Sequence, residues 1–175
     1  IDLIENINET RESLDIRLLD MIISLDMYPM QISSSLLKKV NNIKYLETIK
    51  PDGIILSGGN DIGNHKQRDD FEKSILKWSE LNKIPVFGIC RGLQLINIYK
   101  KGSLVKVNGH CKTRHKIHGR KEFESREVNS YHEYGVTERT LGENLIPIAK
   151  SIDGCIEALK HSYLPWLAIM WHPER

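Results

Sequence analysis

Apolar residues follow helical spacing in some segments and form short unbroken runs in others. Apolar positions three or four residues apart predict helices over residues 11–25 and 69–81, and a third helix is expected over 91–100. The unbroken runs Ile54–Leu56 and Ile84–Ile89 predict two buried strands. Fully apolar strands that alternate with helices are typical of a parallel sheet covered by helices on both faces.

The pattern changes after residue 104. Short candidate strands recur there, which predicts a second half with more antiparallel pairing. We expect these strands at residues 127–130, 145–149, 156–161 and 167–171. Residues 108–125 are polar, basic and rich in histidine, and they predict a surface loop. The expected fold class is therefore α/β, with a mostly parallel central sheet and a more antiparallel C-terminal half.

Composition limits the classes of function. The chain has 175 residues, 40% of them hydrophobic and 27% charged, enough for one domain with one core. Its net charge of +2 indicates no strong attraction to nucleic acid or to an anionic membrane. The sequence contains no apolar run of the roughly 18 residues that a membrane helix needs, and no signal peptide at its visible start.

Cysteine and histidine spacing bears on metals and on the redox setting. Cys90, Cys111 and Cys155 stand at irregular intervals and form neither a zinc pattern nor a disulfide framework. This favours a reducing, cytoplasmic setting. The set His110, Cys111, His115 and His118 also lacks regular ligand spacing, so we expect no metal site.

The stretch VFGICRG places Cys90 between two glycines, directly after an apolar strand and before a helix. A strand that turns sharply into a helix, with a reactive residue at the turn, is the geometry of a nucleophile elbow. We expect the helix N-terminus to favour the thiolate and to lower the pKa of the thiol. A buried cysteine between two packing glycines explains the short motif equally well.

Two further segments supply groups that a nucleophilic thiol needs. His172 follows a predicted strand, and Glu174 lies two residues on, within reach of one ring nitrogen. Gly58 and Gly59 form a loop after the first strand, where the Gly59 amide and that of Arg91 would hold an oxyanion. Considered alone, the His-Pro-Glu segment is more simply interpreted as the end of a strand that reaches solvent. The two glycines alone are more simply interpreted as an ordinary turn.

Four motifs occur in the order ILSGGND, GICRGLQLIN, VNSYHEYGV and IMWHPER over residues 51–175. Together they resemble the class I glutamine amidotransferase-like superfamily. The resemblance implies a flavodoxin-like three-layer sandwich and no cofactor. It also implies a catalytic triad of Cys90, His172 and Glu174, an oxyanion hole from the backbone of Gly59 and Arg91, and substrate-binding positions at Gly58, Asn60, Gln94, Ser130, Tyr131 and His132.

Domain organisation follows from the same resemblance. We expect residues 1–175 to form one hydrolase domain of this type. The family's first strand would then precede Ile1, and its last helix would follow Arg175.

Within the superfamily, Cys-Arg-Gly together with Asn-Ser-x-His is similar to the γ-glutamyl hydrolase branch, the peptidase C26 group. Its members act without a protein partner. The 82-residue separation of Cys90 and His172 and the SGGNDIG…RDDFE stretch look most like short bacterial members from cell-surface polysaccharide gene sets. The implied reaction is hydrolysis of a γ-glutamyl amide through a cysteinyl thioester. The implied substrate is γ-glutamyl-CDP-amidate, which yields glutamate and cytidine diphosphoramidate for capsule modification.

Other functions stay open on the sequence. The chain could hydrolyse another γ-glutamyl amine, or serve as the glutaminase subunit that supplies ammonia to a partner synthetase. A catalytically inactive binding module is disfavoured, because Cys90, His172 and Glu174 are all present. A phosphate-bearing leaving group would find cations in the basic segment, although a solvated segment is the simpler interpretation. Those residues are Lys112, Arg114, His115, Lys116, His118 and Arg120.

Overall fold

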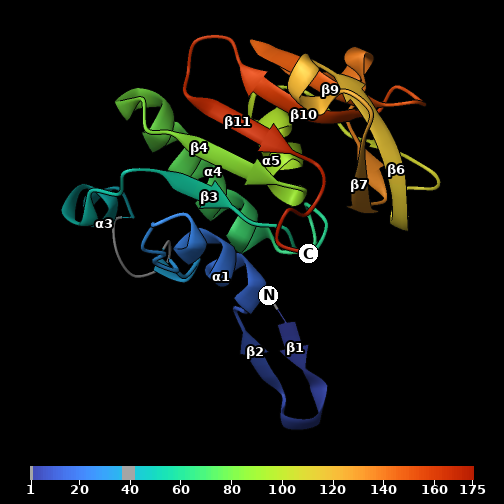
Figure 1. Cartoon of the computed structure of the whole chain (residues 1–175). Coiled ribbons are helices and arrows are strands. Elements are labelled where there is room, and N and C mark those ends of the chain that lie inside the picture. Colours follow the sequence, from blue (N-terminus) through green and yellow to red (C-terminus); the bar gives the residue numbers. More distant parts are fainter. Residues whose placement is uncertain (1, 37–41) are drawn as a thin grey trace.

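A seven-stranded mixed sheet forms the centre of the computed structural model, which describes residues 2–36 and 42–175 (Figure 1). Its strands, in spatial order, are β3 (Ile54–Leu56), β4 (Val86–Ile89), β11 (Trp166–Ile169), β10 (Ile156–His161), β9 (Leu145–Ser151), β6 (Cys111–Gly119) and β7 (Arg126–Tyr131). Strands β3, β4 and β11 are parallel, and every pairing from β11 to β7 is antiparallel. The predicted α/β class, parallel first and antiparallel later, is confirmed.

The described helices are α1 (Ile16–Ser24), α3 (Asn42–Ile49), α4 (Lys66–Asn82) and α5 (Arg91–Tyr99). Helix α5 packs against β3, β4 and β11, and α4 packs against both α3 and α5. The helices predicted over 69–81 and 91–100 are confirmed with small shifts of their ends. Among residues 2–36 and 42–175, no helix is both long and apolar enough to cross a membrane.

The first predicted helix begins later than expected. Helix α1 starts at Ile16 because the Asp15 carboxylate accepts a hydrogen bond from the Arg17 backbone N–H at 3.0 Å, an N-cap contact. The preceding residues instead form an antiparallel hairpin of β1 (Asp2–Ile4) and β2 (Glu9–Arg11), joined by the 3₁₀ turn η1 (Glu5–Ile7). This hairpin projects from the rest of the molecule (Figure 1).

The antiparallel half contains the main error of the sequence prediction. Residues 108–125 are not a surface loop, because β6 runs for nine residues through this segment and pairs with both β7 and β9. Alternate residues of β6 face inward, and of these His115 is polar while Ile117 is fully buried. An inward histidine hides the apolar–polar alternation by which a strand is recognised.

The other predicted strands of this half are present. The structure contains strands over 127–130, 145–149 and 156–161, and β11 ends at Ile169, two residues before the predicted end. A small second sheet pairs β5 (Val105–Lys106) with β8 (Tyr134–Gly135). The 3₁₀ turns η2 (Lys121–Phe123) and η3 (Glu138–Thr140) complete the described elements.

Candidate active site

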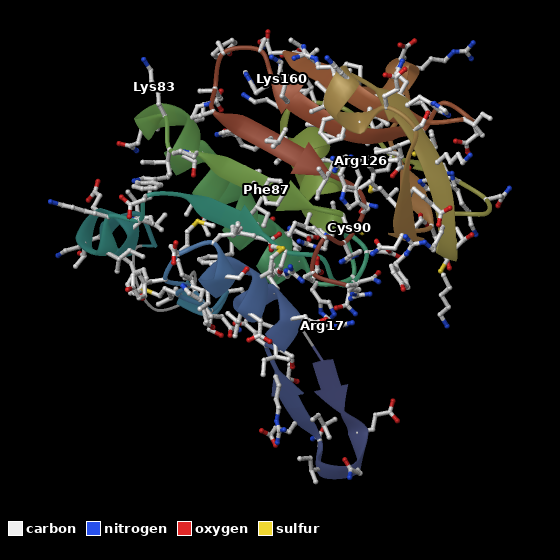
Figure 2. The ribbon with its side chains drawn as sticks, in the orientation of Figure 1. Arg17, Lys83, Phe87, Cys90, Arg126 and Lys160 are labelled. Atoms are coloured by element: carbon white, nitrogen blue, oxygen red, sulfur yellow. The ribbon has the colours of Figure 1, made fainter. Side chains whose placement is uncertain are left out.

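Cys90 stands at the turn between β4 and α5 (Figure 2). Its backbone angles, φ 49° and ψ −101°, are strained for a residue with a side chain. The Cys90 N–H donates to the Ile169 carbonyl at 2.8 Å, which holds the strained residue beside the end of β11. A Cβ on Gly92 would clash with the Leu56 carbonyl oxygen, so the helix packs this closely only with glycine there. The predicted strand–turn–helix elbow is therefore present.

The thiol of Cys90 is buried, with 6% of the residue exposed. Burial raises the pKa of Cys90 to about 12, although the hydrogen bond from the Arg91 backbone N–H acts in the opposite direction. The helix start does lower this pKa, but burial raises it by more, so the expectation of a net lowering is wrong. Nucleophilic attack by Cys90 consequently needs a base that removes the thiol proton.

His172 lies at the same edge of the sheet as Cys90. Strands β4 and β11 run parallel with Ile89 opposite Ile169, so the residues that follow each strand emerge side by side. His172 Nδ1 is 2.7 Å from Glu174 Oε1, and because a carboxylate only accepts, Nδ1 carries the proton. Nε2 of a neutral His172 then holds a lone pair and can accept a proton.

Glu174 is suited to orient this imidazole. Its side chain is 4% exposed. Burial is the largest single influence and disfavours the charged carboxylate, but the hydrogen bonds from His172 and from the backbone, together with the charges of His172 and Arg175, outweigh it, and the pKa of Glu174 lies below its ordinary value. The predicted contact of the two side chains is therefore present, and their role as an oriented base with an ionised partner stays a prediction.

Gly58 and Gly59 follow β3, the other parallel neighbour of β4. A Cβ on Gly58 would lie 2.7 Å from His172 Cε1, so the imidazole packs directly on the backbone of this loop. Gly59 has φ +143°, and a Cβ there would also clash with Arg68 Nη1. Both glycines are therefore required, one for the close approach of His172 and one for its backbone conformation.

The side chain of Arg91 is held in a buried ion-pair network with α4. Its guanidinium is 2% exposed and forms ion pairs with Asp69 and Glu72 of α4. The same Glu72 accepts from Arg68 at 2.8 Å, and Arg68 Nη2 donates to the Gly58 carbonyl at 3.1 Å. This buried network connects the start of α5 with the glycine loop.

Asn129 was not among the predicted site residues, yet it holds His172 in place. Its Nδ2 donates to the His172 carbonyl at 2.8 Å, and its Oδ1 accepts from the His172 backbone N–H at 2.8 Å. The two bonds join β7 to the segment after β11 across 43 residues of sequence. Asn129 lies in the motif VNSYH, but neither its neighbours in the sequence nor its spacing from His172 predicts hydrogen bonds to the His172 backbone.

The predicted substrate-binding residues fall into two groups. Tyr131 is 42% exposed, and its ring meets the His172 ring edge-on with centroids 5.8 Å apart, while Asn60 is exposed on the glycine loop. Gln94, Ser130 and His132 are instead buried. Gln94 donates to the Tyr134 carbonyl at 2.8 Å, and the Ser130 hydroxyl donates to the His110 carbonyl. Substrate contact by Gln94, and by the backbone of Ser130 and His132, stays a prediction.

The basic segment is divided between two faces of β6. Lys112, Arg114, Lys116 and His118 are exposed, and Arg114 pairs with Glu127 of β7 at 2.6 Å. His115 points the opposite way, toward buried Glu157. Arg114 and His115 therefore cannot contact one phosphate group together.

The chain matches the family "Glutamine amidotransferase class-I" over residues 2–175. It is 36% identical over 128 residues to the γ-glutamyl-CDP-amidate hydrolase of Campylobacter jejuni, an alignment that covers 70% of this chain and 62% of that protein. It is 33% identical over 158 residues to the carbamoyl phosphate synthase arginine-specific small chain of Bacillus subtilis, covering 84% of this chain and 44% of that one. The chain thus spans less than two thirds of the length of either relative.

A solved structure agrees on the fold. The crystal structure of a glutamine amidotransferase from Thermotoga maritima superposes with a TM-score of 0.70 at 15% identity, covering 90% of this chain and 69% of that one. Fold and sequence family thus agree with each other. The chain belongs to the class I glutamine amidotransferase family.

Proposed function

We propose that this protein hydrolyses the amide bond of a γ-glutamyl compound and releases glutamate through a thioester on Cys90. The observation that carries the proposal is the contact of His172 Nδ1 with Glu174 Oε1 at 2.7 Å, just after the strand that pairs with the strand before Cys90. A protonated thiol, an oriented base and a glycine loop meet at one sheet edge. This combination suits acyl transfer by a cysteine nucleophile.

In the first half of the reaction, His172 Nε2 takes the proton of the Cys90 thiol as sulfur attacks the δ-carbonyl carbon. The amides of Gly59 and Arg91 donate to the oxyanion that forms, a contribution typically of about 3–4 kcal/mol for one donor. The C–N bond then breaks, and His172 returns the proton to the leaving nitrogen. The product on the enzyme is a glutamyl thioester.

In the second half, a water molecule enters beside His172. His172 removes a proton from the water molecule as the water oxygen attacks the carbonyl carbon of the thioester. The C–S bond breaks, glutamate leaves, and the proton held by His172 returns to the Cys90 sulfur. Glu174 remains ionised throughout and stabilises the imidazolium in each half.

For the leaving group, we propose the nucleotide of γ-glutamyl-CDP-amidate, in the context of capsule modification. Support comes from the similarity to the Campylobacter jejuni enzyme of that name. The free thiols of Cys90, Cys111 and Cys155 support a reducing, cytoplasmic setting. With this substrate, the chain would act without a protein partner.

A second candidate function is the release of ammonia from glutamine for a partner synthetase. The similarity to a carbamoyl phosphate synthase small chain favours it, because that protein is by name one chain of a synthase. The chemistry at Cys90 would be the same. The two functions differ in the leaving group and in the need for a partner.

An assay of glutamate release from a panel of substrates separates these functions. The panel contains glutamine, a γ-glutamyl amine, a γ-glutamyl peptide and γ-glutamyl-CDP-amidate, each with wild-type protein and with Cys90→Ala as the blank. We expect the highest kcat/KM with γ-glutamyl-CDP-amidate and no turnover by Cys90→Ala. Preference for glutamine, raised further by a partner synthetase, would favour the second function.

A further inference from the structure

A cluster of buried polar side chains lies inside the antiparallel half, apart from Cys90. Its centre is Glu157 of β10, which is fully buried. Three imidazoles surround it. His110 Nδ1, His115 Nε2 and His132 Nε2 lie 3.5, 3.3 and 3.7 Å from Glu157 Oε1. Cys155, two residues before Glu157, is also buried and free.

The inward-facing atoms of this cluster lack hydrogen-bond partners. Within residues 2–36 and 42–175, eight buried side-chain nitrogen or oxygen atoms have none, and five of the eight belong to these three histidines and Glu157. His110 and His132 are each 4% exposed. Unpaired polar atoms in the interior are costly, so these five require either ring protons donated to Glu157 or a bound cation.

The outer nitrogens of two rings fix which inner nitrogens hold lone pairs. His110 Nε2 is 2.8 Å from the carboxylate of Asp153, and His132 Nδ1 is 3.0 Å from the Tyr134 carbonyl. Both partners only accept, so each outer nitrogen carries the proton. In the neutral rings, His110 Nδ1 and His132 Nε2 then point lone pairs at one space. Carboxylate–histidine pairs of this kind commonly orient metal ligands.

We propose that this cluster binds one zinc ion, with His110 Nδ1, His132 Nε2, the Glu157 carboxylate and Cys155 Sγ as ligands. The ligand atoms of His110, Cys155 and Glu157 lie within 4.8 Å of one another. Zinc bonds of about 2.0–2.3 Å require these atoms to move inward by roughly 1 Å, within the range of side-chain rotation. This proposal does not depend on the proposed function.

The donor set favours zinc over harder cations. Imidazole and thiolate suit zinc, whereas calcium and magnesium prefer oxygen ligands. Binding displaces the Cys155 thiol proton to solvent. Zinc with one thiolate, one carboxylate and two neutral imidazoles has no net charge, which suits a buried site. Four protein ligands leave no open position, so the ion would be structural.

The ligands come from three separate parts of the chain, which explains why spacing predicted no site. His110 precedes β6, His132 follows β7, and Cys155 and Glu157 lie at the start of β10. Only the pairing of β7 with β6, of β6 with β9 and of β9 with β10 assembles them. A bound ion would link these strands by coordination.

Cobalt titration tests the site, because tetrahedral Co²⁺ absorbs visible light and a thiolate ligand adds a charge-transfer band. The protein is Cys90→Ala/Cys111→Ser, stripped of metal with a chelator, so that Cys155 is its one thiol. We expect one Co²⁺ per chain with both absorptions, and displacement by one equivalent of Zn²⁺. We also expect Zn²⁺ to raise the thermal unfolding temperature by at least about 5 °C.

Four variants in this background localise the ion. Cys155→Ser should lose the charge-transfer band, and Glu157→Gln should weaken binding by at least about 100-fold. Asp153→Asn, at a partly exposed carboxylate, should keep the fold and weaken binding about 10–100-fold. His118→Ala, an exposed histidine of β6, should bind cobalt unchanged.

Two results would overturn the proposal. One is a metal-free protein that takes up no cobalt or zinc and shows doubly protonated rings at His110 and His132 by ¹⁵N NMR, since protons would then satisfy Glu157. The other is uptake of cobalt that Asp153→Asn and Cys155→Ser both leave unchanged, which would locate the ion elsewhere.

Discussion

The two halves of the central sheet use the same types of residue in opposite ways. In the parallel half, β3, β4 and β11 are apolar, and Gly59, Cys90 and His172 lie in the turns after the strands. In the antiparallel half, His115 and Glu157 lie within strands and face inward. A histidine–glutamate pair at the edge of a sheet is accessible to a substrate. A histidine–glutamate pair inside the sheet connects neighbouring strands instead. The halves should therefore respond differently to mutation, one in rate and the other in stability.

The largest contrast is expected between His172→Ala and His110→Ala. Loss of the base should lower kcat by about 10³–10⁴-fold, an effect on rate far larger than its effect on stability. Loss of His110 removes one partner from each of Asp153 and Glu157 and should lower the unfolding temperature. Its folded fraction should keep kcat within a few-fold. Steady-state kinetics and calorimetry on both variants test this. A His110→Ala variant that is stable but inactive would contradict the separation of rate effects from stability effects.

The glycine loop allows a matched pair of substitutions. Gly59→Ala forces a side chain into φ +143° and against Arg68, which displaces the proposed oxyanion donor. We expect kcat to fall by about 10²–10³-fold. Gly63→Ala, at φ +101° with open space around it, imposes backbone strain alone. If both variants lose the same activity in kinetic assays, strain explains the loss and Gly59 has no separate role.

Asn129 tests whether the antiparallel half also orients the base. Asn129→Ala removes both hydrogen bonds to the His172 backbone, and we expect kcat to fall about 10–100-fold with KM nearly constant. The pH–rate profile should also shift, since the base is misplaced. Asn97→Ala is the control, because Asn97 is also buried but donates to the carbonyls of Ser103 and Thr140 and not to His172. Asn97→Ala should lower stability only. A matching pH shift in both variants would contradict the positioning role.

The smallest effect concerns the pH dependence of stability. The pKa of Glu174 is lowered in the folded protein, so its carboxylate stabilises the fold above the ordinary pKa of a glutamate. That contribution is lost as the pH falls through the folded value. Glu174→Gln should therefore unfold at a lower temperature than the wild type at pH 7, and the gap should narrow below about pH 4. If calorimetry finds the same difference in unfolding temperature at every pH, then ionisation of Glu174 does not contribute to the loss of stability in acid.

The parallel half could largely be predicted from the sequence. Its strands Ile54–Leu56 and Val86–Ile89 are apolar on both faces, and each is followed by glycines that mark a turn. Such signals are local in sequence. The antiparallel half was harder because β6 carries His115 where a strand normally carries an apolar residue, and only the fold supplies its partner Glu157.

The same distinction applies to the candidate site. Cys90, His172 and Glu174 lie in recognisable motifs, and the structure brings the elbow and the His172–Glu174 pair to neighbouring strands. Asn129 could not be assigned in advance, because its bonds to His172 depend on how β7 approaches β11. Burial likewise decides the pKa of Cys90, and burial is a property of the packed core.

The most direct test of the account is to trap the acyl-enzyme. The protein is mixed with a γ-glutamyl amide, quenched in acid within one turnover, digested and analysed by mass spectrometry. We predict one glutamyl group on the peptide of the wild type that contains Cys90. The adduct should be absent from Cys90→Ala, and it should form far more slowly in His172→Ala, which lacks the base for attack by the thiol. Glutamate release at the wild-type rate by Cys90→Ala, with no adduct on the wild type, would contradict the account.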